Sequence, residues 1–171
     1  MSRTTDYAPP KPLEKSFDRE AFDCGVEPLN EYLRKFALQS QKKDAARTYV
    51  VVDTNNSILG YYTLVFGAVE PDDVPDKILS GLGRYQIPIL LLARLAVSFS
   101  EKGKGLGGLL MQDAFLRAIQ ASEIAGLRAV MVNAKDETAR SFYEKLGFQP
   151  AKSDQLKLFL KISEIRSGLR S

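Results

Sequence analysis

The chain has 171 residues, 44% of them hydrophobic and 26% charged, which is the size and composition of one globular domain. It contains no histidine, so histidine triads, a histidine general base and histidine-ligated zinc are excluded. Its single cysteine, Cys24, excludes an internal disulfide and is typical of the reducing cytoplasm. The net charge of +3 alone says little about a polyanionic partner.

The N-terminal segment is polar and contains prolines, so we expect residues 1–15 to form a flexible tail and residues 16–171 to form a single domain. This segment lacks the apolar core of a secretory signal. No apolar run in the chain approaches the roughly 20 residues that span a bilayer. We therefore expect a cytoplasmic protein that does not contact membranes.

The first half of the chain contains a predicted helix and a predicted hairpin. Apolar residues recur at spacings of three and four over Pro28–Lys43, which predicts a helix. β-branched residues predict strands over Arg47–Asp53 and Ile58–Gly67, and the turn residues Asn55–Ser57 join them as an antiparallel hairpin. The stretch Glu70–Arg84 is expected to be rich in loops, with one short helix.

The second half alternates strands and helices. The nearly continuous apolar run Ile87–Val97, which Arg94 interrupts, predicts a strand that is buried on both faces. The elements expected after it are a helix over Leu106–Ala125 that Gly126 ends, a strand over Leu127–Ala134, a helix over Asp136–Leu146 and a strand over Leu156–Ile162. This order predicts an α/β fold in which helices flank a mixed central sheet.

A glycine-rich segment, which we call the glycine turn, lies between the apolar strand and the long helix. Glycine has no Cβ atom, so backbone N–H groups can approach an anion closely. The start of the helix adds further N–H donors and the positive end of its dipole. The sequence therefore predicts a pyrophosphate-binding turn made of Lys102, Gly103, Lys104, Gly105, Leu106, Gly107 and Gly108.

Two other interpretations of the glycine turn stay open at this point. It is also consistent with a tight connection that binds nothing, or with the nicotinamide fingerprint G-x-G-x-x-G at Gly103, Gly105 and Gly108. Against the fingerprint, only about 65 residues follow, too few for the usual series of strand-helix-strand units. The nucleoside-triphosphate loop is absent because no Gly-Lys-[ST] triplet occurs.

Residues 133–148 read NAKDETARSFYEKLGF, and with the glycine turn they resemble the GNAT superfamily of acetyltransferases. Motif A of that superfamily, [Q/R]-x-x-G-x-[G/A], corresponds to Lys102, Gly105 and Gly107. Lysine replaces the usual glutamine or arginine, which keeps the charge but loses the planar fork. Motif B ends in [FL]-Y-x-x-x-G-F, which corresponds to residues 142–148. The resemblance covers residues 49–159 and implies the GNAT fold, with acetyl-CoA as co-substrate and no metal.

The resemblance implies a role for several further residues. Tyr143 corresponds to the general acid, and a phenol with a pKa near 10 can donate a proton without being ionised at neutral pH. The alternative is that Tyr143 only packs beside its aromatic neighbours. If the strand is bulged near its end, its N–H groups can bind the thioester oxygen. The cofactor contacts expected outside the glycine turn are Leu95, Ala96, Val97, Asp136, Arg140 and Phe142. At Asp136 the superfamily often has asparagine.

A narrower resemblance covers most of the chain. The stretches FDCGVEPLNEYLRKFALQSQKKDAARTYVV, LLARLAVS and QASEIAGLRAVMVNAKDETARSFYEKLGF resemble the GNAT toxins of bacterial toxin–antitoxin pairs. This implies that the acceptor is the α-amine of the aminoacyl group on charged tRNA, and that its acetylation blocks translation. It also implies a homodimer and a small antitoxin partner, often with a ribbon-helix-helix DNA-binding part.

The absence of histidine bears on the acceptor. A lysine ε-amine has a pKa near 10.4, whereas an α-amine titrates near 7.7–8.0 and already has a substantial neutral fraction without a base. A site without an obvious base therefore favours the aminoacyl group of charged tRNA. Glu70, Asp136 or a chain of waters remain alternative bases.

Charged tRNA requires a positive surface. The residues that we expect to contact it cluster around the first helix, with one more in the apolar strand: Arg34, Lys35, Lys42, Lys43, Arg47 and Arg94. A solvated helical face is the alternative for the cluster. For Arg94 the alternative is a structural ion pair, because a charge in an apolar strand needs a partner.

Two other functions stay open from the sequence. One is a GNAT enzyme that acetylates a small-molecule amine or a protein amine. The other is a module that binds acetyl-CoA without catalysis.

Overall fold

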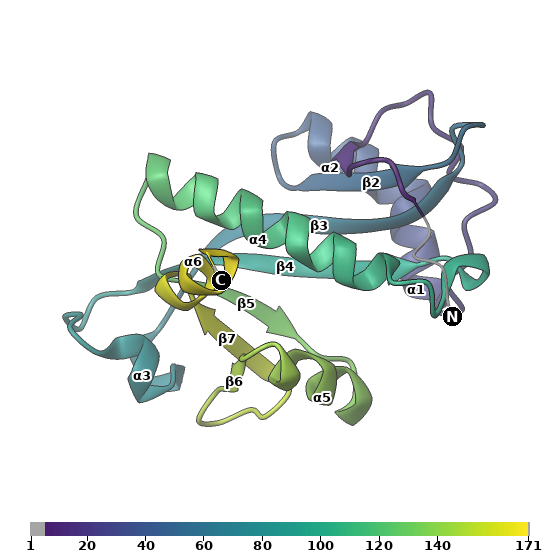
Figure 1. Ribbon diagram of the computed structural model, residues 1–171. Helices are drawn as coiled ribbons and strands as arrows, with labels where there is room; N and C mark the ends of the chain where they lie inside the picture. The colour runs from purple at the N-terminus through teal and green to yellow at the C-terminus, as the bar shows by residue number, and fades with distance from the viewer. Residues whose placement is uncertain (1–5, 171) are drawn as a thin grey trace. The chain divides into compact units, whose positions relative to one another are not determined.

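The computed structural model describes residues 6–170 and shows an α/β protein (Figure 1). Within these residues seven strands form one sheet in the order β1-β2-β3-β4-β5-β7-β6. The β4–β5 pair is parallel, whereas β1–β2, β2–β3, β5–β7 and β6–β7 are antiparallel. The predicted α/β class with a mixed sheet is therefore confirmed.

The bounds of the elements are as follows. The strands are β1 (Lys11–Pro12), β2 (Arg47–Val52), β3 (Ile58–Val69), β4 (Ile87–Val97), β5 (Ala129–Asn133), β6 (Gln149–Pro150) and β7 (Lys157–Lys161). The helical segments are α1 (Glu27–Glu31), the π-helix η1 (Tyr32–Phe36), α2 (Ala37–Lys42), the 3₁₀ turns η2 (Pro71–Asp73) and η3 (Phe99–Glu101), α3 (Asp76–Leu79), α4 (Leu106–Ile124), α5 (Glu137–Lys145) and α6 (Ile162–Arg170).

The chain divides into two compact units, each built from two stretches of sequence. Unit 1 contains the residues up to Val65 together with Ala93–Ala114. Unit 2 contains Phe66–Leu92 and the residues from Phe115 onward. Three elements, β3, β4 and α4, contribute residues to both units. The single domain expected over residues 16–171 stays a prediction.

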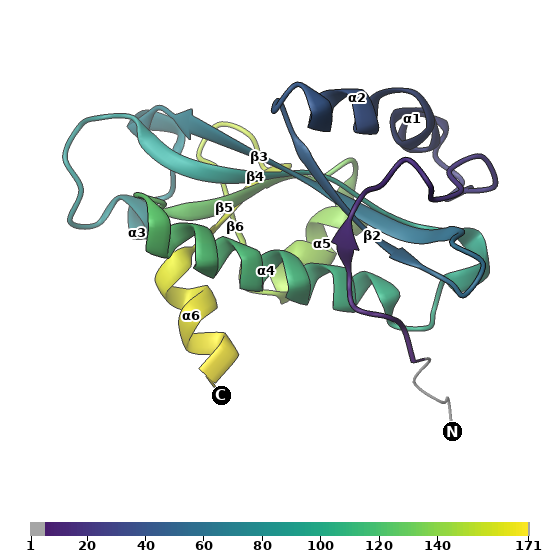
Figure 2. The ribbon, with the colours of Figure 1, turned by 90° about the horizontal axis from the view of Figure 1, so that it is seen from above.

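In unit 1 the β2–β3 hairpin lies between helical layers. Figure 2 shows α1 and α2 on one face of the hairpin and the first part of α4 on the other. On the first face, Tyr61 and Leu33 are completely buried. On the second face, Gly60 lets the helix approach, because a Cβ there would lie 2.9 Å from Cδ2 of Leu106. Apolar burial on both faces stabilises the hairpin.

The predicted hairpin is confirmed, and its turn follows from its sequence. The Asp53 carboxylate accepts hydrogen bonds from the N–H groups of Asn55, at 2.8 Å, and Ser57, at 3.0 Å. Asn56 adopts a left-handed conformation with φ of 62°, which asparagine tolerates better than most residues. The side chain of aspartate therefore organises the reversal.

The predicted helix over Pro28–Lys43 is confirmed as one helical stretch, but its centre is π-helical. The π-helical segment begins at Tyr32, which is 8% exposed. Spacings of three and four are those of an α-helix, whereas a π-helix has i→i+5 hydrogen bonds, so the pattern predicts the helix but not the wider winding of its centre.

In unit 2 an apolar cluster lies around β5 and β7. It consists of Val74, Ile78, Ile87, Ile89, Ala129, Met131, Ala151 and Phe159. Arg128, just before β5, donates to the carbonyl oxygens of Ile78 and Ser80 at 2.8 and 2.5 Å. These bonds fix α3 and its end against the start of β5. The strand and helix predicted around Asn133 are confirmed as β5 and α5.

The N-terminal segment differs from the flexible tail that we expected. Lys11 and Pro12 form β1, which pairs with Val50 and Tyr49 of β2, and Leu13 is buried at 3% exposure. A strand of two residues has no periodicity, so the sequence gives no sign of it. The part of the predicted tail over residues 1–5 lies outside the described residues.

Two more elements were not predicted. β6 is too short to show a pattern, and α6 begins directly where β7 ends, so the apolar run of the strand hides the helix start. Among residues 6–170, no helix combines the length and apolar character that crossing a bilayer requires.

Candidate functional site

The glycine turn connects η3 with α4 in unit 1. Gly103 and Gly105 have φ values of 79° and 88°, a left-handed conformation that strains any residue with a side chain. A Cβ atom at Gly103, Gly105 or Gly108 would meet no described atom within 4 Å. The turn therefore presents open backbone rather than packed backbone, as a cradle for a ligand requires.

The first turn of α4 supplies hydrogen-bond donors. The N–H of Leu109 bonds to the carbonyl of Gly105 at 3.2 Å, so the N–H groups of residues 106–108 precede the first intrahelical bond. These groups and the helix dipole favour an anion. Lys104 lies close by, and its ammonium is 3.7 Å from the Glu101 carboxylate. The chemistry of this donor set fits a pyrophosphate.

Lys102 is engaged with the protein. Its ammonium donates to the carbonyl oxygen of Cys24 at 2.9 Å and lies 4.4 Å from the centre of the Phe99 ring. The sequence predicted that this lysine grips the pyrophosphate. In the structure it ties the glycine turn to the segment before α1.

The end of β4 lies beside the glycine turn in unit 1. Ala96 is buried at 5% exposure, while Leu95 and Val97 are half-buried. The Ala96 carbonyl oxygen would lie 3.3 Å from a Cβ at position 60, so Gly60 also gives room to this strand. The expected bulge that opens the N–H groups of residues 95–97 stays a prediction.

Tyr143 lies near the end of α5 in unit 2, and the helix cap holds it. The N–H of Phe148 donates to the Tyr143 carbonyl at 3.2 Å, and the N–H of Gly147 donates to the Glu144 carbonyl at 3.0 Å. Gly147 has φ of 102°, so this is a Schellman cap. The residues of the sequence pattern Y-x-x-x-G-F therefore form this helix cap, and the cap fixes the backbone position of Tyr143.

The Tyr143 side chain is mostly enclosed. The residue is 9% exposed, and its ring packs edge-on against Phe142 and Phe148, with centroids 5.2 and 5.4 Å away. Burial disfavours the phenolate and raises the pKa of Tyr143 to about 12. The hydroxyl therefore keeps its proton at neutral pH.

The other candidate cofactor residues of unit 2 have structural partners on α5. Asp136 is the N-cap residue, and its carboxylate accepts from the Ala139 N–H at 2.8 Å. Arg140 donates to the carboxylates of Glu144, at 2.7 Å, and Glu137, at 3.2 Å. Phe142 is 39% exposed. Asp136 thus caps the helix, a role that asparagine can fill equally well.

The candidate tRNA-binding residues in unit 1 differ in how they are paired. Three have carboxylate partners: Arg34 with Glu27 at 2.6 Å, Lys35 with Glu31 at 3.6 Å, and Arg47 with Asp44 at 2.8 Å. Lys42 and Lys43 are exposed at the end of α2. Exposed pairs of this kind are weak, so a phosphate can replace the carboxylate as the partner of these cations.

Arg94 of β4 stacks on an aromatic ring. Its guanidinium carbon lies 3.6 Å from the centre of the Tyr32 ring, at the first residue of the π-helix. This cation–π contact leaves the N–H groups in the guanidinium plane able to donate to a phosphate. The contact is a third possibility besides the ion pair and the substrate role that the sequence left open.

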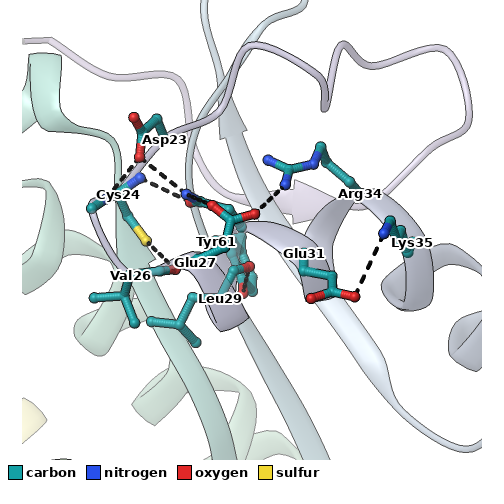
Figure 3. A network of polar contacts seen from close by, with 11 residues as sticks. Asp23, Cys24, Val26, Glu27, Leu29, Glu31, Arg34, Lys35 and Tyr61 are labelled. Atoms are coloured by element: carbon teal, nitrogen blue, oxygen red, sulfur yellow. Dashed lines mark hydrogen bonds and ion pairs between the residues drawn. The ribbon is translucent and has the colours of Figure 1, made fainter.

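A polar network before and within α1 was not predicted from the sequence. Asp23, Cys24 and Glu27 lie together at its start, and Arg34 bonds to Glu27 (Figure 3). The buried Asn30 links the first three. In the sequence the network corresponds to Asp-Cys-Gly, followed shortly by the Pro-Leu-Asn at the start of the helix. Among the sequence observations, only the stretches quoted for the resemblance to the toxins include these residues.

The candidate residues thus form two groups. Unit 1 brings together the glycine turn, the end of β4 and Arg94, whereas unit 2 holds the α5 residues and Tyr143.

Comparison with known proteins gives the family. The model of the acetyltransferase (GNAT) domain matches residues 45–150. A tRNA-acetylating toxin of Mycobacterium tuberculosis is 34% identical over 161 residues, which cover 94% of this chain and 96% of that protein.

Solved structures of related toxins agree with this family match. The structure of AtaT complexed with acetyl-methionyl-tRNAfMet superposes with a TM-score of 0.88 at 28% identity, covering 96% of this chain and 99% of that one. A tyrosine-to-phenylalanine mutant of the AtaT toxin, bound to the C-terminus of the antitoxin AtaR and acetyl-CoA, gives 0.83 at 28% identity and covers 98% and 100%. The chain therefore belongs to the GNAT family of acetyltransferases, among relatives of the tRNA-acetylating toxins.

Proposed function

We propose that this protein is a toxin that transfers an acetyl group from acetyl-CoA to the α-amine of the aminoacyl group on charged tRNA and so stops translation. The observation that carries the proposal is the match along nearly the whole chain to a tRNA-acetylating toxin, at 34% identity. A neighbour solved with acetyl-methionyl-tRNA supports the same acceptor class. The match of residues 45–150 to the acetyltransferase (GNAT) domain supports the acetyl-transfer chemistry.

The glycine turn is the proposed site for the phosphates of acetyl-CoA. The open backbone at Gly103 and Gly105 and the N–H groups that begin α4 are the donors. Lys104 adds positive charge, and Asp136, Arg140 and Phe142 are proposed as further contacts. Bound acetyl-CoA supplies the acetyl group as a thioester, which an amine can attack.

Tyr143 is the proposed general acid. Because its pKa is raised to about 12, its Oη holds a proton at every physiological pH and can give it to a leaving thiolate. The acceptor amine loses a proton as it forms the amide, so the phenol can be restored and the reaction balances. The N–H groups near residues 95–97 are the proposed donors to the carbonyl oxygen.

The acceptor end requires cations rather than a base. An α-amine with a pKa near 7.7–8.0 is substantially neutral at physiological pH, so the absence of histidine is no obstacle. Arg94 is the proposed contact to a phosphate near the aminoacyl end, because stacking on Tyr32 holds its fork in place. The residues around α2 are proposed to contact phosphates further along the tRNA: Arg34, Lys35, Lys42, Lys43 and Arg47.

The proposed partners follow from the same relatives. AtaT is solved with its antitoxin AtaR, so we propose a small antitoxin for this chain, with a DNA-binding part of the ribbon-helix-helix kind. We also propose a homodimer, and a cytoplasmic location because charged tRNA is found there.

Mass spectrometry of charged tRNA tests the function. Total charged tRNA is incubated with the protein and acetyl-CoA, digested to aminoacyl-adenosines and analysed for a gain of one acetyl group. We expect acetylated aminoacyl-adenosine with the wild type and almost none with Tyr143→Phe, and growth arrest on expression of the wild type only. Release of CoA with polyamines or aminoglycosides but not with charged tRNA would show a small-amine enzyme instead. Binding of acetyl-CoA without transfer to any acceptor would show a non-catalytic module.

A further inference from the structure

The segment before α1 is attached to the residues that lead into the glycine turn. The N–H of Phe99 donates to the Asp23 carbonyl at 2.8 Å, and the Lys102 ammonium donates to the Cys24 carbonyl at 2.9 Å. Both acceptors are main-chain oxygens, so their positions depend on how the backbone of residues 23–25 is held. Two bonds thus fix both ends of the four residues before the first glycine.

Gly25 makes the attachment close. Its φ of 86° requires glycine, and a Cβ atom there would lie only 2.3 Å from Cζ of Phe99. The Phe99 ring is 57% exposed, so little else encloses it. The same ring carries the Lys102 ammonium 4.4 Å above its centre. The ring therefore links the glycine of one segment to the lysine of the other.

Asn30 holds this backbone in place from within the helix. It is 3% exposed, and its Oδ1 accepts from the Cys24 N–H at 2.9 Å. Its Nδ2 donates to the carboxylates of Asp23, at 3.0 Å, and Glu27, at 3.4 Å. Asp23 also accepts from the Gly25 N–H at 2.9 Å. In Figure 3, Asp23 and Cys24 lie next to each other beside the start of α1.

These bonds lower the pKa of Asp23, first through the Gly25 N–H and then through Asn30. The carboxylate therefore stays ionised and accepts both bonds at neutral pH. A buried amide that uses both its oxygen and its nitrogen is costly to replace, because each lost partner leaves another group unsatisfied.

We infer that Asp23, Cys24, Gly25 and Asn30 form a clamp that positions the glycine turn, and that Lys102 acts as the anchor of this clamp rather than as a direct ligand of the phosphates. The inference rests on the proposed role of the glycine turn in acetyl-CoA binding. It assigns phosphate binding to the backbone of residues 103–108 and makes Asn30, a residue far from the turn in sequence, a positioning residue for the co-substrate.

Two thioesters separate a positioning role from a merely structural one. Acetyl-pantetheine carries the same thioester as acetyl-CoA but none of its phosphates. Equilibrium dialysis with a radiolabelled acetyl group measures the Kd of each, and needs no acceptor, so the result stands whether or not charged tRNA is the substrate. The variants are Asn30→Ala, Lys102→Met, the double variant and Gly25→Ala.

We expect Asn30→Ala and Lys102→Met each to weaken acetyl-CoA binding by about 5- to 10-fold, as for one lost hydrogen bond. The Kd of acetyl-pantetheine should change by less than about twofold. The double variant should have the same Kd for acetyl-CoA as the single variant that binds it more weakly. Gly25→Ala should act in the same way through its clash with Phe99. Amide hydrogen exchange of residues 103–108 in the free protein should become faster in all of them.

The controls match each change. Asn55→Ala removes an exposed asparagine of the hairpin turn, and Gly81→Ala introduces the same strain at φ of 83° with no atom within 4 Å of the new Cβ. Both should leave acetyl-CoA binding unchanged. Multiplied losses in the double variant would show that Lys102 touches the phosphates itself. Equal weakening of both thioesters would show that the network only supports folding, and Lys102→Met, at an exposed position, keeps the test valid if Asn30→Ala does not fold.

Discussion

Position 143 is fixed twice by the same neighbours. Phe148 bonds to the Tyr143 carbonyl through its N–H and packs against the Tyr143 ring, and Gly147 makes the reversal between them possible. The backbone cap and the side-chain contact thus hold one phenol at one place. At the scale of single residues, these contacts explain how the phenol that we propose as the general acid can be positioned on a helix of nine residues.

Tyr143→Phe tests the proton. The ring keeps its size and its edge contacts, so we expect the Kd of acetyl-CoA and the melting temperature to stay the same while kcat falls by about 10²- to 10⁴-fold. Steady-state kinetics on charged tRNA measure this. Tyr85→Phe, at an 85% exposed position, is the control and should keep full activity. A kcat close to that of the wild type would show that water supplies the proton.

The pH dependence of kcat/KM tests the pKa values. Burial raises the pKa of Tyr143 to about 12, so deprotonation of this group causes loss of activity only as the pH approaches that value. The acceptor α-amine must be neutral, so kcat/KM should rise through about pH 8 and then level off. A profile measured on charged tRNA with short reaction times checks this. A fall of kcat/KM that begins below about pH 10 would contradict the assignment of a buried, protonated phenol.

Gly147→Ala tests the cap. A side chain at φ of 102° is strained, so we expect a loss of about 1–2 kcal/mol in the free energy of unfolding, measured by urea denaturation. Because the cap holds Tyr143, kcat should fall as well. Gly126→Ala is the control, since its added Cβ meets nothing within 4 Å and its φ lies outside the left-handed region. Equal stability of the two variants would mean that the cap is not under strain.

At the scale of elements, periodicity decided what the sequence could predict. The hairpin, β4, α4, β5 and α5 each present a run of apolar residues or turn residues long enough to be recognised. β1 and β6 have two residues each, which is too short for a recognisable pattern, and the strand that pairs with β1 is remote in the chain. No local pattern marks the π-helical winding of η1, and Tyr32 at its start contacts Arg94 and Tyr61, which are both remote in the chain.

Removal of residues 1–15 tests the contribution of β1. The shortened protein would lose the burial of Leu13 and expose the outer edge of β2, so we expect it to be less stable by about 1.5–3 kcal/mol and to aggregate more readily. Thermal unfolding and light scattering measure the two effects. A protein shortened by residues 1–6 keeps β1 and serves as the control. If both shortened proteins melt at the same temperature, β1 contributes nothing to stability.

At the scale of the whole molecule, the sequence predicted the family and the chemistry, but not the roles of individual residues such as Lys102 and Arg94. The spacing of Lys102, Gly105 and Gly107 and the pattern around Tyr143 predicted acetyl-CoA chemistry, because backbone donors and caps depend on local sequence. The partners of Lys102 and Arg94 lie 78 and 62 positions away, at Cys24 and Tyr32. Such contacts follow from the tertiary fold, so sequence patterns could nominate these residues but not assign their roles.

The charge distribution leads to a prediction about tRNA. Lys42→Gln with Lys43→Gln removes two exposed cations at the end of α2, and we expect weaker binding of charged tRNA together with a salt dependence reduced by about two counterions. Titrations at several salt concentrations measure the slope. Lys145→Gln with Lys152→Gln changes the net charge equally in unit 2 and should leave the slope unchanged. An equal reduction of the slope in both double variants would mean that tRNA binding depends only on the net charge of the protein.

Cys24 gives the clamp a chemical reporter. It is the only sulfhydryl of the chain, it is 4% exposed, and its Sγ donates to the Val26 carbonyl at 3.6 Å. A maleimide or disulfide reagent can therefore reach it only when residues 23–26 separate from their surroundings. The rate of Cys24 alkylation in the native protein would then report the frequency with which residues 23–26 open, without any mutation. A ligand that seats on the glycine turn should slow that reaction.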